Sequence, residues 1–176
     1  MRIAAVPGLV GEKAPELRTD RLLLRRARES DLEPLHAIFT DAQTMAHWST
    51  PVHASLDQSR AWLRSMIEGG DTHVEDFIIE YDGEAVGKVG AYQLPEFGIL
   101  VRRDLWGMGL ASEALEAYID YMRARGMPYL VADVDPANKA SLRIMEKAGF
   151  ARSGFEAEAM EYDGRMVDSV FLRRDL

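Results

Sequence analysis

A glycine-rich turn at the start of an expected helix is the part of this sequence best suited to bind an anion. In the stretch DLWGMGLASEAL, residues 104–115, Gly107 and Gly109 stand directly before a run of good helix formers. The first N–H groups of a helix have no partner within the helix, and the helix dipole places partial positive charge there. Glycines also let an anionic group approach the backbone without a Cβ in the way. The stretch therefore predicts a site for a phosphate-bearing ligand, to which Arg102 and Arg103 could add positive charge.

The spacing of the turn excludes two common phosphate-binding motifs. A P-loop has the pattern G-x-x-x-x-G-K-[ST], but the residue after Gly109 is Leu110. A dinucleotide-binding turn has the pattern G-x-G-x-x-G, but the residue three after Gly109 is Ser112. On the glycines alone, a plain tight turn that only packs a helix against a strand is an equal alternative.

A second expected helix, over residues 138–149, also begins with polar side chains. Asn138 is a good N-cap, and Gly149 suits the position after the last turn. Ser141 stands where a capping box would have Glu or Gln, so the helix does not need this hydroxyl group for capping. Asn138 and Ser141 either serve the helix alone or contribute to a ligand site at its start.

Together, the two stretches resemble the GNAT superfamily of acyl-CoA-dependent N-acyltransferases. The sequence WGMGLASEAL begins at Trp106, and DPANKASLRIMEKAGF begins at Asp135. The likeness extends from about Leu17 to the C-terminus and is greatest to the branch that acetylates N-terminal residues of ribosomal proteins, with its small-molecule relatives. It implies transfer of an acetyl group from acetyl-CoA to a primary amine, which is a peptide N-terminus or a small cationic amine.

The resemblance also implies where acetyl-CoA binds. The family's pyrophosphate loop, [QR]-x-x-G-x-[GA], aligns with residues 106–111, where Trp106 replaces Gln or Arg. Side-chain contacts from that position are therefore not carried over. The implied role of Ser141 is to stand near the thioester sulfur and protonate the departing thiolate. The residues expected to bind the cosubstrate are Leu100, Val101, Met108, Gly109, Leu110, Ala111, Ser112, Asn138 and Ser141.

The transfer needs a base, because a free amine is mostly protonated near neutral pH. Glu96 is the carboxylate best placed for this role, because it begins the strand before the glycine turn and follows Pro95. Glu80 and Glu156 are alternatives, and ordered water without a dedicated base is another. The resemblance further implies that a backbone N–H within residues 99–101 stabilises the oxyanion.

The acceptor amine is expected beside the segment between the first two expected helices. Residues 42–54 include His47, Trp48 and His53, an aromatic composition unusual for an exposed loop, and loops often carry binding residues. Asp168 interrupts an apolar strand and could orient an amine. We assign Trp48, His47 and Asp168 to acceptor binding. The simpler alternatives are a tryptophan that fills the edge of the core, a structural or solvated histidine and a solvent-facing aspartate.

The hydrophobic pattern predicts the elements that must position these residues. Strands are expected at residues 21–27, 73–81, 84–92, 96–104, 128–134, 150–162 and 165–176, and helices at 30–41, 55–69, 110–126 and 138–149. Asp82-Gly83 and Asp163-Gly164 indicate hairpin turns, and residues 128–134 are apolar enough for a strand buried on both faces. Together with the resemblance, this order predicts a single-domain α/β GNAT fold over residues 17–176. Its mixed central sheet would have about seven strands flanked by about four helices, after a flexible tail at residues 1–16.

Composition limits the possible functions further. The 176 residues are 47% hydrophobic and 28% charged, as in an ordinary globular protein. The net charge of −8 argues against nucleic-acid binding, which needs a basic surface, and favours a cationic partner unless it serves only solubility. Without cysteine, a thiol acyl-enzyme and thiolate metal sites are excluded, so direct transfer in a ternary complex without a metal is expected.

The sequence also bears on location and on alternative functions. No apolar run approaches the roughly 20 residues of a membrane helix, and MRIAAVPGLVGEK is a poor signal peptide. We therefore expect a cytoplasmic enzyme with no membrane partner, and a homodimer is possible. Two alternatives are a non-catalytic module that senses acyl-CoA and a flavin or nucleotide protein that uses the same glycine turn.

Overall fold

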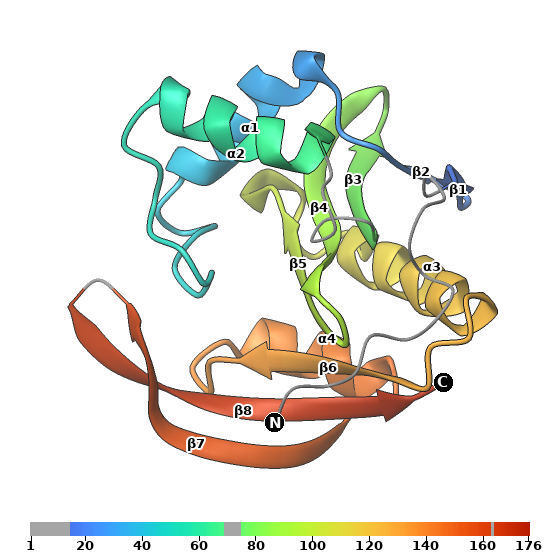
Figure 1. The fold of residues 1–176 in the computed structure, drawn as a ribbon, viewed down its shortest axis with the longest axis vertical. Coiled ribbons are helices and arrows are strands. Elements are labelled where there is room, and N and C mark those ends of the chain that lie inside the picture. The colour runs from blue at the N-terminus through green and yellow to red at the C-terminus, as the bar shows by residue number, and fades with distance from the viewer. Residues whose placement is uncertain (1–14, 69–74, 163) are drawn as a thin grey trace.

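In the part of the chain that the structure describes, eight strands form one open mixed sheet (Figure 1). This computed structural model describes residues 15–68, 75–162 and 164–176. The sheet order is β1-β2-β3-β4-β5-β6-β8-β7. The strands are β1 (Leu17–Arg18), β2 (Leu22–Arg25), β3 (Glu75–Tyr81), β4 (Glu84–Gln93), β5 (Glu96–Val101), β6 (Tyr129–Val134), β7 (Ala151–Tyr162) and β8 (Arg165–Asp175). The helices are α1 (Leu32–Thr40), α2 (Leu56–Glu68), α3 (Leu110–Ala124) and α4 (Lys139–Lys147).

The α/β class and the four helices agree with the sequence prediction, but the sheet has one strand more. The additional strand, β1, is two residues long and pairs with β2 through Leu17–Leu24 and Arg18–Leu23. Two residues are too few for an alternating pattern to reveal a strand. The hairpin turn between β3 and β4 is confirmed, because Asp82 and Gly83 both have positive φ, at 53° and 79°.

Some expected features lie outside the described residues. The expected tail at residues 1–16 is described only at Pro15 and Glu16. The turn residue Asp163 and the first two residues of the strand expected at 73–81 are also outside them. Tyr162 and Arg165 are paired, so β7 and β8 form the antiparallel pair that was expected on either side of that turn.

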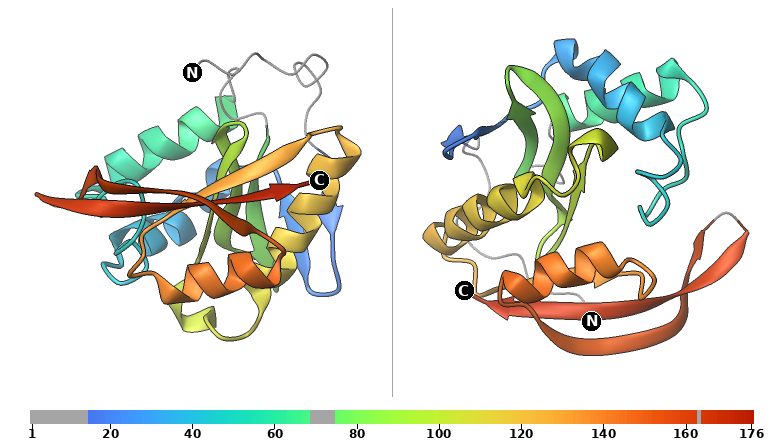
Figure 2. Two further views of the ribbon diagram at one scale, coloured as in Figure 1. Left: turned by 90° about the horizontal axis from the view of Figure 1, so that it is seen from below. Right: turned by 180° about the vertical axis from the view of Figure 1, so that it is seen from behind.

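The sheet divides between β5 and β6. Among the described residues, these parallel strands share one registered pair, Glu96 with Val131, whereas β6 and β8 share six. A β-bulge shifts the register of β4 against β5 between Gly90 and Gln93. Bulges bend a strand and increase its twist, so β5 meets β6 at one end and then diverges from it. Figures 1 and 2 show the two halves of the sheet separating beyond this point.

Helices pack on opposite faces of β5. Phe97 and Val101 belong to the larger core cluster, which includes side chains of α3 and α4. Leu100 belongs to a second cluster with side chains of α1 and α2. Successive side chains of a strand point to opposite faces. Glu96, Gly98 and Leu100 therefore share the face of β5 that α1 and α2 cover.

Strand β6 is buried on one face only, so the expectation of a strand buried on both faces is wrong. Leu130, Ala132 and Val134 are buried in the larger core cluster, whereas Asp133 is exposed. The reason is the division of the sheet, which leaves the other face of β6 without a covering helix of its own.

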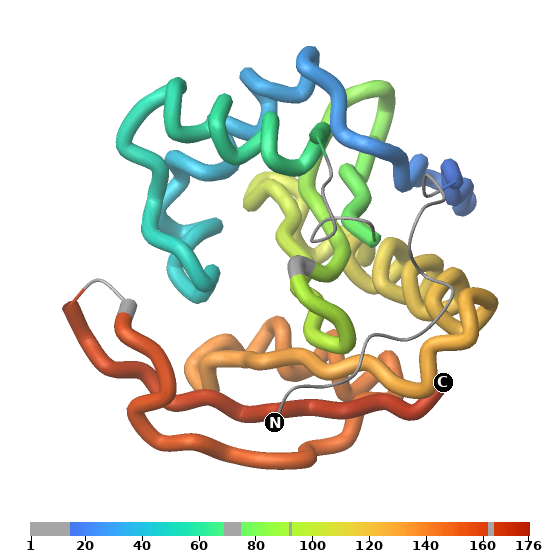
Figure 3. Tube along the Cα trace, viewed as in Figure 1, coloured from blue at the N-terminus to red at the C-terminus, as the bar shows by residue number. Residues whose placement is uncertain are grey.

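The long hairpin of β7 and β8 extends from the second half of the sheet. Its register shifts between Glu156 and Met160, and Glu158 has a φ of 52° within this bulge. The far end of the hairpin curves toward the segment between α1 and α2 (Figure 3). Within the described segments, no helix is long and apolar enough to span a membrane.

Candidate functional site

The glycine turn has the open backbone geometry that an anion site needs. Gly107 and Gly109 have φ of 78° and 80°, a left-handed conformation that other residues adopt at a cost. Gly109 is the N-cap of α3, and the first helical bond runs from the N–H of Glu113 to the carbonyl of Gly109. A Cβ added at Gly107 would meet no atom within 4 Å. The turn is thus open to a ligand, and the amides of residues 110–112 have no partner within the helix.

Trp106 ties this turn to the end of β5. Its indole Nε1 donates a hydrogen bond of 2.7 Å to the carbonyl oxygen of Val101, while the residue remains 52% exposed. The resemblance to the family's loop had carried over no side-chain role for this position, because Trp106 replaces Gln or Arg there. The contact joins the strand and the glycine turn, which are the two places where acetyl-CoA was expected to bind.

Arg102 and Arg103 form ion pairs with carboxylates that lie outside the glycine turn. Arg102 pairs with Glu84 at 3.0 Å and with Asp104 at 2.7 Å. Arg103 lies 3.3 Å from Asp41. The expected contribution of these arginines to an anion site is therefore largely offset by their own partners.

The start of α4 is built as the sequence predicts. The side-chain oxygen of Asn138 accepts a hydrogen bond of 3.0 Å from the N–H of Ser141, so Asn138 is the N-cap. Gly149 has a φ of 79°, as expected after a helix. Ser141 is half-buried, and its hydroxyl group has no hydrogen-bond partner among the described residues. This hydroxyl group can therefore serve a ligand.

Beyond Glu96, the edge of β5 that faces β6 has no strand partner among the described residues. Leu100 and Val101 lie on this part of the strand, with their side chains buried in the two core clusters. Apart from the Val101 carbonyl oxygen, which accepts the hydrogen bond from Trp106, backbone groups along this edge can pair with an extended ligand or donate to an oxygen atom. They include the segment 99–101 that was expected to stabilise an oxyanion.

Glu96 lies where the two halves of the sheet meet. Glu96 is exposed to solvent, but partial desolvation by the surrounding protein raises the pKa of its carboxyl, and the negative charge of Asp133 raises it further. A carboxylate with a raised pKa is a stronger base. Glu96 therefore has the position and the chemistry of a candidate base.

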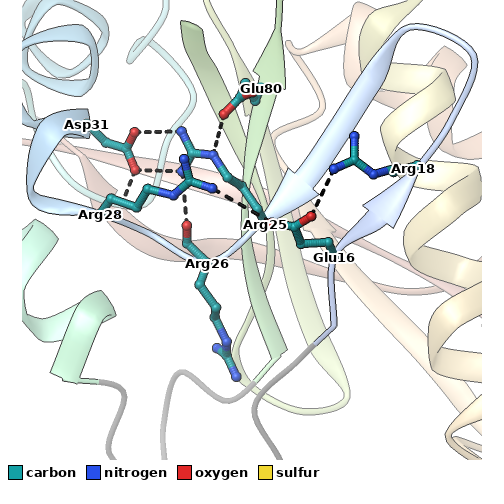
Figure 4. Close-up of polar contacts among 7 residues, drawn as sticks. All are labelled: Glu16, Arg18, Arg25, Arg26, Arg28, Asp31 and Glu80. Atoms are coloured by element: carbon teal, nitrogen blue, oxygen red, sulfur yellow. Dashed lines mark hydrogen bonds and ion pairs between the residues drawn. The ribbon is translucent and has the colours of Figure 1, made fainter. Parts of the chain in front are cut away.

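The alternative Glu80 is bound in a different network (Figure 4). Its Oε2 accepts a hydrogen bond from Nε of Arg25, whose other nitrogens bind Asp31 at 2.8 and 2.9 Å. This network occupies the Glu80 carboxylate. Glu156 is exposed on β7, opposite Ser169.

Trp48 lies directly on β5. A Cβ added at Gly98 would lie 3.0 Å from Cη2 of Trp48, so the absence of a side chain at Gly98 gives the ring its place. Because Glu96 and Gly98 share a face of β5, the Trp48 ring is on the same side of the sheet as the Glu96 carboxylate. The structure thus brings these two predicted residues together, although the ring also packs against the core cluster of α1 and α2.

His47 reaches from this segment to the other half of the sheet. Its Nδ1 lies 2.7 Å from Oδ2 of Asp135, which directly follows β6. The other carboxylate oxygen of Asp135 accepts a hydrogen bond of 2.7 Å from the N–H of Ala137, in the turn before α4. His47 is thereby connected to the turn that carries Asn138. Asp135 had no expected role, and its place within the quoted motif DPANKAS was the only sign of one.

His53 and Asp168 have structural contacts. His53 is buried and its Nδ1 lies 2.8 Å from Oγ of Ser59, and burial lowers its pKa. Asp168 accepts a hydrogen bond of 3.0 Å from the N–H of Glu158 and so supports the β7 bulge. Among the described residues, no contact joins Asp168 to His47 or Trp48. The same residues contain no group of three or more His, Asp or Glu side chains that could hold a metal ion.

Comparisons with known proteins agree with this geometry. A family model described as "Acetyltransferase (GNAT) domain" matches residues 21–151. The L-methionine sulfoximine/L-methionine sulfone acetyltransferase of Pseudomonas aeruginosa is 30% identical over 169 residues, covering 87% of this chain and 94% of the relative. Spermidine N(1)-acetyltransferase of Escherichia coli is 28% identical over 144 residues, covering 74% of this chain and 73% of the relative.

The fold is also similar to solved structures. The ribosomal L7/L12 alpha-N-protein acetyltransferase RimL, solved in complex with coenzyme A, superimposes with a TM-score of 0.81 at 20% identity. The superposition covers 92% of this chain and 98% of that chain.

Proposed function

Because the chain belongs to the GNAT acetyltransferase family, we propose that it transfers an acetyl group directly from acetyl-CoA to a primary amine in a ternary complex. It is an N-acetyltransferase of the branch that includes the ribosomal-protein acetyltransferases, and acetyl-CoA is its cosubstrate. The acceptor is a protein or peptide N-terminus or a small cationic amine.

The glycine turn is the observation that carries this proposal. Positive φ at Gly107 and Gly109 leaves an open surface before α3, next to the end of β5 and to the division of the sheet. This is the arrangement that a pyrophosphate and an extended pantetheine chain require. The amides of Met108 to Ser112 would hold the pyrophosphate, and the free edge of β5 would hold the chain.

Each chemical step can be assigned to a group of this chain. When bound, acetyl-CoA supplies an acetyl group activated as a thioester. Glu96 would take a proton from the acceptor amine, directly or through water, so that the nitrogen can form the new bond. A backbone N–H within residues 99–101 would stabilise the charge on the carbonyl oxygen. As the bond between the acetyl carbon and sulfur breaks, Ser141 would give its hydroxyl proton to the departing thiolate. Ser141 would then take up, through water, the second proton that the amine nitrogen loses on becoming an amide, so the products are a neutral amide and coenzyme A thiol.

The acceptor would bind on the α1 and α2 side of β5. The Trp48 ring forms one wall there, with the Glu96 carboxylate on the same face. His47 and Asp135 hold the adjoining segment against the start of α4. Asp168, which we also assign to the acceptor, would act from the hairpin that curves toward this segment (Figure 3). The relatives named for spermidine and for L-methionine sulfoximine support both polyamines and amino-acid derivatives as acceptor classes to test.

Release of coenzyme A thiol tests the proposal. The protein is incubated with acetyl-CoA and a panel of spermidine, amino-acid derivatives and short peptides, and the free thiol is titrated. We expect release that depends on one class of amine and falls in Ser141→Ala and Glu96→Gln. Initial rates with both substrates varied should give intersecting lines.

Binding without turnover would overturn the enzymatic proposal and favour an acyl-CoA sensor. The remaining alternative is a flavin or nucleotide protein that uses the same glycine turn, and calorimetry tests it. Tighter binding of FMN, NAD or ATP than of coenzyme A would contradict the assignment of the turn to coenzyme A.

A further inference from the structure

Arg21 is held against the glycine turn by contacts between residues far apart in the sequence, which were not expected. It lies in the bend between β1 and β2, and its Nη1 donates a hydrogen bond of 2.9 Å to the carbonyl oxygen of Met108. Its Nε and Nη2 each lie 2.7 Å from Oε2 of Glu113. A Cβ added at Gly109 would lie 3.5 Å from Nη2. The guanidinium group therefore touches both the turn and the first helical turn of α3.

Glu113 explains why a positive charge is needed there. Its carboxylate also accepts hydrogen bonds from the hydroxyl group of Thr19, at 2.5 Å, and from the N–H of Arg21, at 2.9 Å. Burial raises the pKa of Glu113, but these hydrogen bonds outweigh burial and lower it overall. Glu113 is thus ionised in the first turn of the helix whose amides face the turn. An uncompensated carboxylate there would repel a pyrophosphate group.

We propose that Arg21 is a positioning residue for the cosubstrate: it cancels the charge of Glu113 and fixes the Met108 carbonyl so that the loop amides face the pyrophosphate. This inference rests on the proposed binding of acetyl-CoA at the glycine turn. Neither Arg102 nor Arg103 can replace Arg21, because both are paired with other carboxylates.

A purely structural role for Arg21 makes a different prediction. The same contacts fasten the β1–β2 bend to α3, and losing them could lower stability alone. If Arg21 acts by compensating the charge of Glu113, the loss of Arg21 should weaken the binding of coenzyme A. Removing the Glu113 charge as well should then restore part of that affinity. A double-mutant comparison distinguishes the two roles.

The experiment measures the Kd of coenzyme A by calorimetry for wild type, Arg21→Ala, Glu113→Gln and the double variant, with the Tm of each. We expect Arg21→Ala to raise Kd by roughly 10- to 50-fold, the loss typical of a charge-assisted contact. The double variant should bind coenzyme A more tightly than Arg21→Ala does. Arg21→Lys should recover part of the affinity, because it keeps the charge without the two-nitrogen contact.

Arg18→Ala is the matched control. Arg18 lies in β1, three residues from Arg21, and its side chain is 71% exposed with Glu16 as its partner. Its removal should leave Kd unchanged.

Two results would overturn the inference while leaving the proposed function intact. One is an Arg21→Ala variant with a lower Tm and the wild-type Kd, and the other is a double variant that binds as weakly as Arg21→Ala. If wild type itself failed to bind coenzyme A, the proposed function would fail and this inference with it.

Discussion

Nδ1 of His47 lies 2.7 Å from Oδ2 of Asp135, and this contact joins two halves of a sheet that otherwise meet at the pair of Glu96 and Val131. His47 belongs to the segment whose next residue, Trp48, lies on β5. Asp135 belongs to the turn that leads into α4, whose start carries the predicted cosubstrate residues. The contact thus holds the expected acceptor side in place against the expected cosubstrate side.

Loss of this contact should weaken acceptor binding more than cosubstrate binding. We expect His47→Ala and Asp135→Ala to raise the KM of the amine by roughly two- to fivefold, as for a partly exposed polar contact. The KM of acetyl-CoA should change less. Steady-state kinetics with each substrate varied measures both values. His47→Asn, which keeps a donor near the Nδ1 position, should lie closer to wild type. Equal effects on both KM values would contradict this view.

Glu96→Gln should lower kcat by roughly 10²- to 10⁴-fold if Glu96 is the base. Partial desolvation and the charge of Asp133 raise the pKa of this carboxyl. The base must be ionised, so wild-type activity should fall with decreasing pH at a pH above the ordinary range for glutamate. The pH profile of kcat measures this limb, which Glu96→Gln should remove. Glu156→Gln should keep it, and a loss below threefold in Glu96→Gln would favour ordered water as the base.

The role of the glycine turn in binding coenzyme A can be tested by comparing Gly107 with Gly126, a glycine of the same backbone conformation outside the turn. Gly107 and Gly126, at the two ends of α3, both have a φ of 78°, and neither has an atom within 4 Å of an added Cβ. Substitution by alanine should therefore cost each about 1–2 kcal/mol of stability. Only Gly107→Ala should also raise the Kd of coenzyme A. Thermal unfolding and calorimetry give the two quantities, and parallel affinity losses in both variants would argue against a binding role for the turn.

Asp31→Ala should destabilise the fold without changing the Kd of coenzyme A. Arg25 and Asp31 form an ion pair of 2.8 Å, and each side chain is 4% exposed (Figure 4). Removing one partner of a buried ion pair costs about 3–5 kcal/mol when the other charge is left uncompensated. Arg25 keeps its contact with Glu80, so we expect a loss at the lower end of this range. Urea unfolding measures this loss. Glu16→Ala, which removes a carboxylate that is half exposed, should cost less than about 1 kcal/mol.

The features that depend on neighbours in the sequence could be predicted. The cap of α4 is a hydrogen bond between residues three positions apart, Asn138 and Ser141. The glycines before α3 and the hairpin turn at Asp82-Gly83 are likewise local, because a short stretch of backbone needs residues that tolerate positive φ. Periodicity predicted seven of the eight strands, and missed β1 because two residues carry no period.

The sequence by itself therefore determined the family, the order of elements and the two local motifs that point to acetyl-CoA. Tertiary structure alone decided which other residues join them. His47 and Asp135 are 88 residues apart, and Arg21 and Met108 are 87 apart. Single residues such as these leave no pattern in the sequence. The division between β5 and β6, and the one buried face of β6, follow from strand register and a bulge. Both features depend on how strands that are distant in the sequence pair with one another. That pairing is determined by the packing of the whole sheet.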